Sequence, residues 1–250
     1  MGPDVWPLFL GCAFVAEVIG TMAGFGAATV LTPLAALFMD IKTAIAVVAC
    51  FHLFGNASRL VFFGRAIHWK TWAQFGLVGV LCSLLGAGLT ARVPSVVVKL
   101  WLGMFLLCYV GLSVWRPQGV TLPKTPATLV GGGVASGFVA GLIGTGGAIR
   151  SVCLMAFGLP RDAYIGTSAA IALVVDATRI PVYVTEQFIP GRMVPVVVSL
   201  IGAAFAGAWV GRRLVQRVSP VAFQRFVLAM LALMGTRFLW EGGHGLAVVR

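Results

Sequence analysis

The sequence predicts an all-α polytopic membrane protein made of two homologous repeats, each of about four transmembrane helices. The chain has 250 residues, of which 60% are hydrophobic and 10% are charged, whereas about 25% of residues are charged in soluble domains. Apolar runs follow one another along the chain, and roughly 20 apolar residues cross a bilayer core about 30 Å thick. The sequence also resembles itself when it is shifted by 120 positions.

The internal resemblance aligns residues 8–63 with residues 128–183 without a gap. Coincident alanines and leucines mean little in an apolar sequence, but coincident glycines and a coincident arginine within a predicted helix are informative. We therefore divide the chain into repeat 1 (residues 1–115), a linker (116–126) and repeat 2 (127–250). Duplicated halves that enclose a site near the bilayer midplane are typical of transporters. The equivalent positions include Gly11 and Gly131, Gly24 and Gly144, Gly26 and Gly146, Ile45 and Ile165, Asn56 and Asp176, and Arg59 and Arg179.

The first apolar run of each repeat is too long for one straight span. It is interrupted by Gly24-Phe25-Gly26 in repeat 1 and by Gly144-Thr145-Gly146-Gly147 in repeat 2. Glycine has no Cβ and permits a sharp turn. We therefore expect the first helix of each repeat to be broken or re-entrant at its glycine motif.

The later runs of each repeat have the length of single spans, and the linker contains Pro117, Pro123 and Pro126, which interrupt helices. In chain order, the predicted helices span residues 5–23, 27–39, 43–63, 72–91, 96–115, 127–143, 148–158, 163–184, 194–215 and 221–240.

Two membrane topologies fit these helices. If each broken helix crosses the bilayer once, the repeats are parallel; if it returns as a hairpin, the repeats are inverted. Basic residues concentrate on the cytoplasmic side of membrane proteins, and only the hairpin topology gives an uneven distribution. That topology implies a cytoplasmic linker and an N-terminus outside the cell. The linker side would carry Arg65, Lys70, Arg116, Lys124, Arg161, Arg212, Arg213, Arg217 and Arg225, and the other side Lys42, Arg92, Lys99, Arg192 and the arginines of the C-terminal tail.

The charge composition constrains the substrate. The chain has 18 lysines and arginines against 7 acidic residues, a balance that would suggest nucleic acid binding in a soluble protein. Here most cations lie between apolar runs, as topology requires, so no nucleic acid partner is expected. Few acids leave little capacity to coordinate metal cations, and the 5 cysteines lie singly in apolar runs. We expect no metal site and no cofactor, and an anionic or neutral substrate.

The glycine motifs predict an anion-binding cradle. A helix that begins just after Gly144–Gly147 directs its unpaired N–H groups and the positive end of its dipole at the gap. Arg150 lies in its first turn, where a cation is unfavourable unless an anion approaches it. Gly24-Phe25-Gly26 forms a less polar counterpart. The alternative is that these glycines only permit close helix packing.

Arg59 and Arg179 are the second candidate for anion recognition, because a cation buried in a span usually marks a pathway or a partner. Each lies near its helix end, so snorkelling toward the interface is an alternative. Asp176 stands three positions before Arg179, so a local contact would make that arginine structural. Asn56, Ser58 and Thr178 offer further hydrogen bonds.

Two ionisable residues are candidates for coupling. Glu17 lies deep in the first apolar run, where the equivalent residue of repeat 2 is Gly137. It is expected to face the protein interior, either as a protonatable group or as the partner of an arginine across the repeats. His52, on the helix of Arg59, titrates near neutral pH in its free form.

The glycine motifs, the stretch Gly166-Thr167-Ser168 and the duplication resemble the TauE/SafE family of sulfite and organosulfonate exporters over nearly the whole chain. The resemblance implies a secondary transporter in the cell inner membrane that exports a small sulfur oxyanion or organosulfonate of the sulfite or sulfoacetate type. Ala27 stands where repeat 2 has Gly147, so the first cradle is expected to be less open. The substrate-binding candidates are Gly24, Phe25, Gly26, Asn56, Arg59, Gly144, Thr145, Gly146, Gly147, Arg150, Asp176 and Arg179.

Other function classes fit less well. Hydrolases would need a motif such as His-Glu-x-x-His or Gly-x-Ser-x-Gly, and the sequence contains neither. A permease for a metal cation or another small solute stays open as an alternative, although Glu17, His52 and Asp176 are scattered. Partners are a small anion, the lipid bilayer and a coupling proton or ion. The sequence does not determine the oligomeric state, and a homodimer is compatible with it.

Overall fold

The fold is known from a computed structural model that describes residues 5–23, 26–116, 119–214 and 220–248. Short 3-10 turns, η2 (Gly64–Ala66) and η3 (Gly191–Met193), precede α4 and α9. The α-helices are α1 (Trp6–Ala23), α2 (Ala28–Ala35), α3 (Ile41–Phe63), α4 (Trp69–Arg92), α5 (Ser95–Trp115), α6 (Pro126–Ile143), α7 (Gly147–Ala156), α8 (Arg161–Thr185), α9 (Val194–Leu214) and α10 (Pro220–Val248).

Seven helices of the described chain are long and apolar enough to cross a membrane. They are α3, α4, α5, α6, α8, α9 and α10, whereas Trp6–Met22 and Gly147–Ala156 are shorter apolar helices. The predicted all-α polytopic membrane protein is confirmed. Sequence alone also placed most helix ends within a few residues, because Gly, Pro and charged residues interrupt the apolar runs where helices end.

The helices α6 and α7 form a hairpin. The chain turns at Gly144, which has φ +79°, a left-handed conformation that glycine adopts readily. The hydroxyl of Ser136 donates to the carbonyl of Gly146 at 2.8 Å, and a Cβ at Gly132 would collide with the sulfur of Cys153. Residues that follow the turn therefore lie beside residues that precede it, and α7 returns along α6.

The helices α1 and α2 turn back in the same way. The amide of Gly26 donates to the carbonyl of Gly20 at 3.3 Å, and Gly26 has φ +87°. The rings of Phe9 and Phe38, near the far ends of the two arms, lie 5.8 Å apart. Gly24 and Phe25 lie outside the described residues.

Each hairpin packs on a helix from the other part of the chain. Gly137 of α6 meets the backbone of Gly79 in α4, and Gly141 meets Ser83 further along both helices, so α4 and α6 run parallel. Gly207 of α9 meets Glu17 of α1, and one turn later Gly211 meets Val18 and Thr21. The helices α1 and α9 therefore also run parallel. Glycine allows these close approaches because it presents no side chain.

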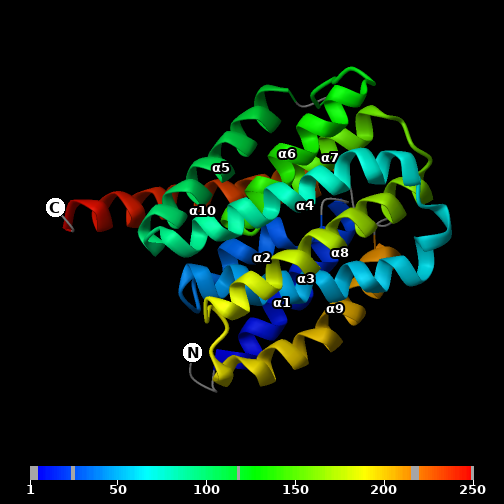
Figure 1. The fold of residues 1–250 in the computed structure, drawn as a ribbon. Coiled ribbons are helices and arrows are strands. Elements are labelled where there is room, and N and C mark those ends of the chain that lie inside the picture. Colours follow the sequence, from blue (N-terminus) through cyan, green and yellow to red (C-terminus); the bar gives the residue numbers. More distant parts are fainter. Residues whose placement is uncertain (1–4, 24–25, 117–118, 215–219, 249–250) are drawn as a thin grey trace.

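The central pair, α3 and α8, joins the two halves of the molecule. Gly166 lies against the carbonyl of Phe63, and His52 contacts Asp176, so α3 and α8 run antiparallel. In Figure 1 the chain ends marked N and C lie at the left, together with the connection from α8 to α9, while the connection from α3 to α4 lies at the right. The helix ends therefore lie at two opposite faces of the molecule.

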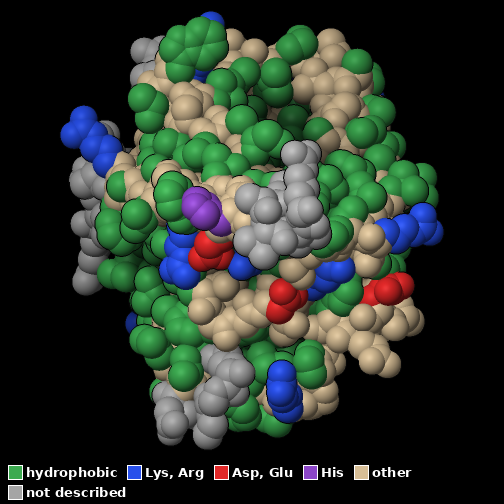
Figure 2. Space-filling view, turned by 90° about the vertical axis from the view of Figure 1, so that its left-hand side faces the viewer, with side chains coloured by type: hydrophobic (Ala, Val, Ile, Leu, Met, Phe, Trp, Pro, Cys, Tyr) green, Lys and Arg blue, Asp and Glu red, His purple; other side chains and the backbone are tan. Residues whose placement is uncertain are grey.

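The surface along the helices exposes many large apolar side chains, as in a protein surrounded by lipid. Figure 2 looks at the end face that lies at the left of Figure 1, where charged side chains gather across the middle and hydrophobic side chains surround them. Soluble monomers rarely expose apolar patches of more than a few hundred Å². Large apolar side chains are exposed along the helices, among them Leu77, Leu81, Leu85, Met104, Val198, Trp209 and Leu233.

The α4–α6 contact provides a stability test. We expect Gly137→Ala to destabilise the protein by about 1–3 kcal/mol, because the added methyl group overpacks a closed contact against the Gly79 backbone. The control is Gly131→Ala on the same helix, where a Cβ meets nothing within 4 Å and where alanine favours the helix by up to about 1 kcal/mol. Thermal unfolding in detergent measures both. Equal melting temperatures for the two variants would contradict the packing argument.

Candidate functional site

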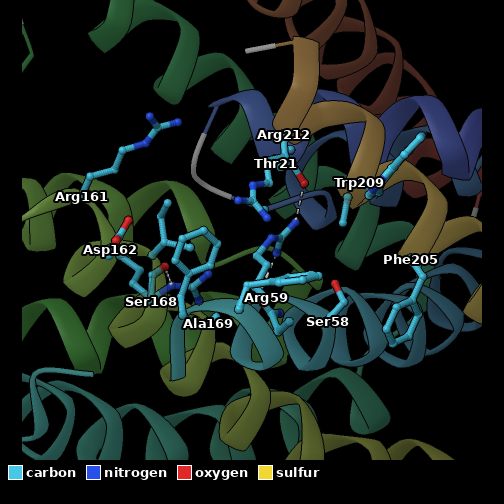
Figure 3. Close-up of a pocket in the computed structure, with 18 residues that line it drawn as sticks. Thr21, Ser58, Arg59, Arg161, Asp162, Ser168, Ala169, Phe205, Trp209 and Arg212 are labelled. Carbon is cyan, nitrogen blue, oxygen red and sulfur yellow. Dashed lines mark hydrogen bonds between the residues drawn. The ribbon is translucent and has the colours of Figure 1, made fainter. Parts of the chain in front are cut away.

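A cavity of about 490 Å³ lies between α1, α3, α8 and α9 (Figure 3). Its mouth is formed by Arg161, Asp162 and Arg212, which are exposed. Its inner part is formed by buried polar groups, among which Asn56 and Ser168 are 1% and 6% exposed. The cavity therefore leads from a charged opening to a polar interior.

Arg59 lies at the centre of the cavity view, and its guanidinium is held by three side chains (Figure 3). Its Nη2 forms an ion pair with Glu17 Oε1 and donates to Thr21 Oγ1 at 3.0 Å. Its Nη1 donates to Asn56 Oδ1 at 2.9 Å. The side chain of Arg59 is 11% exposed, so it reaches the cavity from a largely buried position and does not snorkel to a lipid interface.

Arg150 is the second cation of the inner cavity. It is 4% exposed, and its Nε donates to Ser168 Oγ at 2.9 Å. Among the described residues, no carboxylate lies within ion-pair distance of Arg150, whereas Arg59 has Glu17. Arg150 lies in the first turn of α7, and the dipole of that helix favours negative charge at the same place.

The charged residues of the cavity lining are mostly cationic. Four arginines line it, Arg59, Arg150, Arg161 and Arg212, against one aspartate, Asp162. Glu17 compensates Arg59 from behind the cavity wall. Clefts lined by one sign of charge attract ligands of the opposite sign. Guanidinium groups also bind oxyanions with two parallel hydrogen bonds.

A row of contacting polar side chains connects the cavity to α8. The side-chain amide of Asn56 donates to the carbonyl of His52 at 2.8 Å. Asn56 contacts His52 Nδ1 at 3.1 Å, and His52 Nδ1 contacts Asp176 Oδ2 at 2.8 Å. Asp176 Oδ1 accepts from Arg179 Nη2 at 2.7 Å. Arg59 and Arg179 are therefore joined through three polar side chains, all of them buried.

Arg179 stabilises the end of α6. It is 1% exposed and donates through Nη1 to the carbonyl of Ala140. Thr90 Oγ1 donates to the carbonyl of Leu142 at 2.7 Å, and the hydroxyl of Tyr183 donates to the carbonyl of Gly141 at 2.5 Å. The last carbonyls of a helix have no partner within the helix. Thr90 and Tyr183 supply one for Leu142 and Gly141, while Arg179 adds a second donor to the carbonyl of Ala140, which also accepts from the amide of Gly144 at 3.0 Å.

The two hairpin turns meet each other inside the protein. Thr29 Oγ1 and Thr145 Oγ1 share a hydrogen bond of 2.7 Å. A Cβ at Gly144 would press on Ile45 of α3, and a Cβ at Gly26 would collide with Nε2 of His52. That nitrogen is buried and has no hydrogen-bond partner among the described residues. The turns thus pack on each other and on α3.

The structure separates the predicted site residues into groups. Gly26, Asn56, Arg59 and Arg150 line the cavity. Glu17 and His52 lie behind it, where each contacts one of these residues. The partner of Glu17 belongs to its own half, and the link between the halves runs through His52. Six predicted binding residues do not line the cavity: Gly144, Thr145, Gly146, Gly147, Asp176 and Arg179. Gly24 and Phe25 lie outside the described residues.

Several cavity residues were not singled out from the sequence as binding residues. Thr21 lies four positions after Glu17 and donates to it at 3.2 Å, a spacing that places two side chains on one helix face. That spacing was a usable signal. From the sequence, Arg212 entered only the distribution of basic residues between the two membrane sides, and Trp209 received no role. Their approach to the cavity depends on the packing of α9 against α1.

The chain matches the model of one protein family, described as Sulfite exporter TauE/SafE, over residues 9–238. The match covers α2 to α9 and most of α1 and α10. No significant similarity to a curated protein or to a solved structure was found.

The role of Arg179 in holding α6 generates a stability prediction. We expect Arg179→Ala to destabilise the protein by about 3–5 kcal/mol, because it removes the guanidinium from a buried ion pair with Asp176, whose Oδ1 loses its partner while Oδ2 keeps His52. Arg237→Ala is the control: Arg237 pairs with Glu241 at the surface, and exposed ion pairs contribute about 0–1 kcal/mol. Gel filtration and thermal unfolding in detergent measure the difference. A monodisperse Arg179→Ala protein of wild-type melting temperature would contradict this role.

Proposed function

The chain belongs to the TauE/SafE sulfite exporter family, and from this premise we propose that it is a secondary transporter exporting a small sulfur oxyanion or organosulfonate across the cell inner membrane. Sulfite and sulfoacetate are the types of substrate proposed. The single observation that supports an anion most directly is the cavity lined by four arginines and one aspartate.

The substrate is proposed to bind between Arg59 and Arg150. Both guanidiniums line the inner cavity, and Ser168 and Asn56 offer neutral hydrogen-bonding groups beside them. Guanidinium groups pair with the oxygens of an oxyanion in a geometry that a lysine ammonium does not reproduce. A volume of about 490 Å³ accommodates a small oxyanion together with water, since each water occupies about 30 Å³ in the liquid.

A metal cation, the alternative substrate, is disfavoured by the same electrostatics. Four guanidiniums repel a cation, and Asp162, the carboxylate of the cavity lining, stands at the exposed mouth. Metal cations such as Mg²⁺ and Ca²⁺ prefer several oxygen ligands. The charge of the site therefore favours anion transport.

We propose that the two repeats are inverted and that each hairpin enters the membrane without crossing it. The chain directions support this: α1 runs parallel to α9, α6 runs parallel to α4, and α3 and α8 run antiparallel. The end face that holds Arg65, Arg161, Arg212 and Arg213 is then the cytoplasmic face, by the positive-inside rule. The N-terminus lies outside.

The cavity opens at this proposed cytoplasmic face, since the ends of α3, α8 and α9 that form it lie there. At the opposite face, Lys42 donates to the carbonyl of Ala91 at 3.3 Å and lies over the ring of Phe188. This conformation is the one that would receive substrate from the cytoplasm, as export requires.

Transport assays test the binding site. We expect Arg150→Ala to lower sulfite counterflow in proteoliposomes by at least about tenfold, because charge-assisted hydrogen bonds contribute about 1.5–3 kcal/mol. Arg150→Lys should recover little of this loss if the guanidinium geometry matters. The matched control is Arg65→Ala, an exposed arginine outside the cavity lining. Sulfoacetate, taurine and chloride in the same assay define the substrate class, and unchanged counterflow in Arg150→Ala would refute the site.

Thiol labelling tests the topology. In a variant without native cysteines, we expect Arg65→Cys to react with a membrane-impermeant maleimide only from the cytoplasmic side, and Glu186→Cys only from the outside. Both positions are exposed. Residue 65 follows the end of α3 and residue 186 follows the end of α8, and because these helices run antiparallel, the two residues lie at opposite end faces. Gly119→Cys in the linker serves as the cytoplasmic reference. Labelling of residues 65 and 186 from one and the same side would eliminate this topology.

A further inference from the structure

We propose that Glu17 couples the transport of the anion to a proton: an anion takes Arg59 from Glu17, Glu17 takes up a proton, and the two cross the membrane together. This inference rests on the proposed function, because it assigns a coupling ion to the same cavity.

The position of Glu17 shows that packing does not require an acid there. Gly137, the equivalent residue in the sequence alignment of the halves, meets the backbone of Gly79 in the α4–α6 contact. Glu17 meets Gly207 in the α1–α9 contact. A glycine therefore suffices at one of these parallel helix contacts, and the other carries a carboxylate that is 0% exposed. A buried ionisable group in a membrane span is a functional candidate.

The two oxygens of Glu17 have different environments. Oε1 accepts from Arg59 and from the hydroxyl of Thr21 at 3.2 Å. Oε2 is buried and has no hydrogen-bond partner among the described residues. It lies against Gly55, where a Cβ would stand 2.9 Å from it. Oε2 is thus the oxygen at which a proton is added.

The substrate and Glu17 compete for one guanidinium. Nη2 of Arg59 is directed at Glu17 and Thr21, and Nη1 is directed at Asn56. An anion that binds Arg59 through two parallel hydrogen bonds uses Nη2 together with Nη1 or Nε, because these pairs are the two forks of a guanidinium. Both N–H groups of Nη2 are engaged with Glu17 and Thr21, so an anion bound in this way takes the place of one of them, and in this proposal it takes the place of the carboxylate. Glu17 then remains buried without its counter-charge. A buried carboxylate without a partner is strongly unfavourable, and the group neutralises instead.

The proton step is balanced. A hydronium ion in the cavity water transfers a proton to Oε2, forming a carboxylic acid and leaving water, while Arg59 stays protonated throughout. Thr21 lines the cavity and its hydroxyl contacts Oε1 of Glu17, which places the carboxyl group directly behind the cavity wall. One proton with one monoanion moves no net charge. Export then follows the gradients of the anion and the proton, without a contribution from the membrane potential.

The other ionisable groups near Glu17 are few. From α3 it faces Arg59, and α9 carries Arg212 and Arg213 at its cavity end, while α2 has no ionisable side chain. His52 is the nearest alternative proton acceptor. It is connected to Arg59 through Asn56, but its Nδ1 is engaged with Asp176 and Gly26 covers its Nε2.

The test compares the pH dependence of sulfite transport in wild-type and Glu17→Gln proteoliposomes. Because anion binding takes up a proton, the KM for sulfite in the wild type should rise with pH, by up to about tenfold per pH unit where Glu17 is ionised. Glu17→Gln should lack this rise. Sulfite itself titrates near neutral pH, but equally for both proteins, so the ratio of their KM values between pH 6 and pH 8 isolates the contribution of Glu17.

Two further variants complete the design. Glu17→Gly reproduces the residue found at Gly137, and it replaces the Gln variant if that protein does not fold. Glu186→Gln makes the same chemical change at an exposed position and should keep the wild-type pH profile. An imposed pH gradient should drive sulfite accumulation by the wild type and by Glu186→Gln, whereas the Glu17 variants should retain only exchange of sulfite for sulfite.

The outcomes are distinguishable. A pH profile that is the same in Glu17→Gln, Glu17→Gly and the wild type overturns the coupling role while leaving anion transport intact. If His52→Gln loses the pH dependence of the KM and Glu17→Gln keeps it, then His52 is the proton acceptor. That result also overturns the proposal. Absence of any sulfite transport by the wild type removes the proposed function itself, and this inference with it.

Discussion

The architecture depends on one constraint: a helix that ends inside the protein needs partners for its terminal carbonyl groups, and a bilayer offers no water to supply them. The end of α6 meets this requirement with side chains from other helices, namely Thr90, Arg179 and Tyr183. Because those side chains come from α4 and α8, the hairpin α6–α7 is fixed to both. The positions of the turn, of Arg150 in α7 and of the cavity wall follow from that attachment.

Arg59 and Arg179, which stand 120 positions apart in the sequence, have different surroundings, and the residue three positions before each one accounts for the difference. Arg179 follows Asp176, which holds it in an ion pair three residues away. Arg59 follows Asn56, which offers an amide oxygen and no charge. Arg59 therefore takes its counter-charge from Glu17 on another helix. The ion pair of Arg59 joins two helices, so a competing anion can separate it from Glu17. The ion pair of Arg179 lies within one helix turn, and Arg179 also binds the end of α6, so this pair is harder to open.

The polar chain across α3 and α8 ties the two halves together at the depth of the cavity. His52 and Asp176 come from different halves, and the turns of the two hairpins meet nearby through Thr29 and Thr145. Buried polar networks stabilise one arrangement when all members are satisfied. Here His52 Nε2 and Glu17 Oε2 are without hydrogen-bond partners among the described residues. Both atoms belong to the groups that contact Arg59 directly or through Asn56, so the network is least satisfied beside the cavity.

The chemical character of the site was predictable in part from the sequence. Buried cations are rare in membrane helices, so the sequence drew attention to Arg59 and Arg179, and the structure shows both of them in ion pairs. Which partner each one has was not predictable, because the contacts Glu17–Arg59 and His52–Asp176 join residues that are 42 and 124 positions apart. The pairing of Arg179 with Asp176, three positions away, was foreseeable from helix geometry alone.

The sequence by itself determined that the chain is a bundle of membrane helices and where most of them begin and end, because apolar length and helix-breaking residues are local properties. Only the tertiary structure decided which helices pack together and that the two arms of each hairpin lie side by side. It also decided which residues line one cavity, namely Arg150, Arg59, Thr21 and Arg212. The physical reason is that lipid is as apolar as a leucine side chain, so burial does not select the partners of a membrane helix. Close glycine contacts and buried polar pairs select them, and both depend on residues distant in the chain.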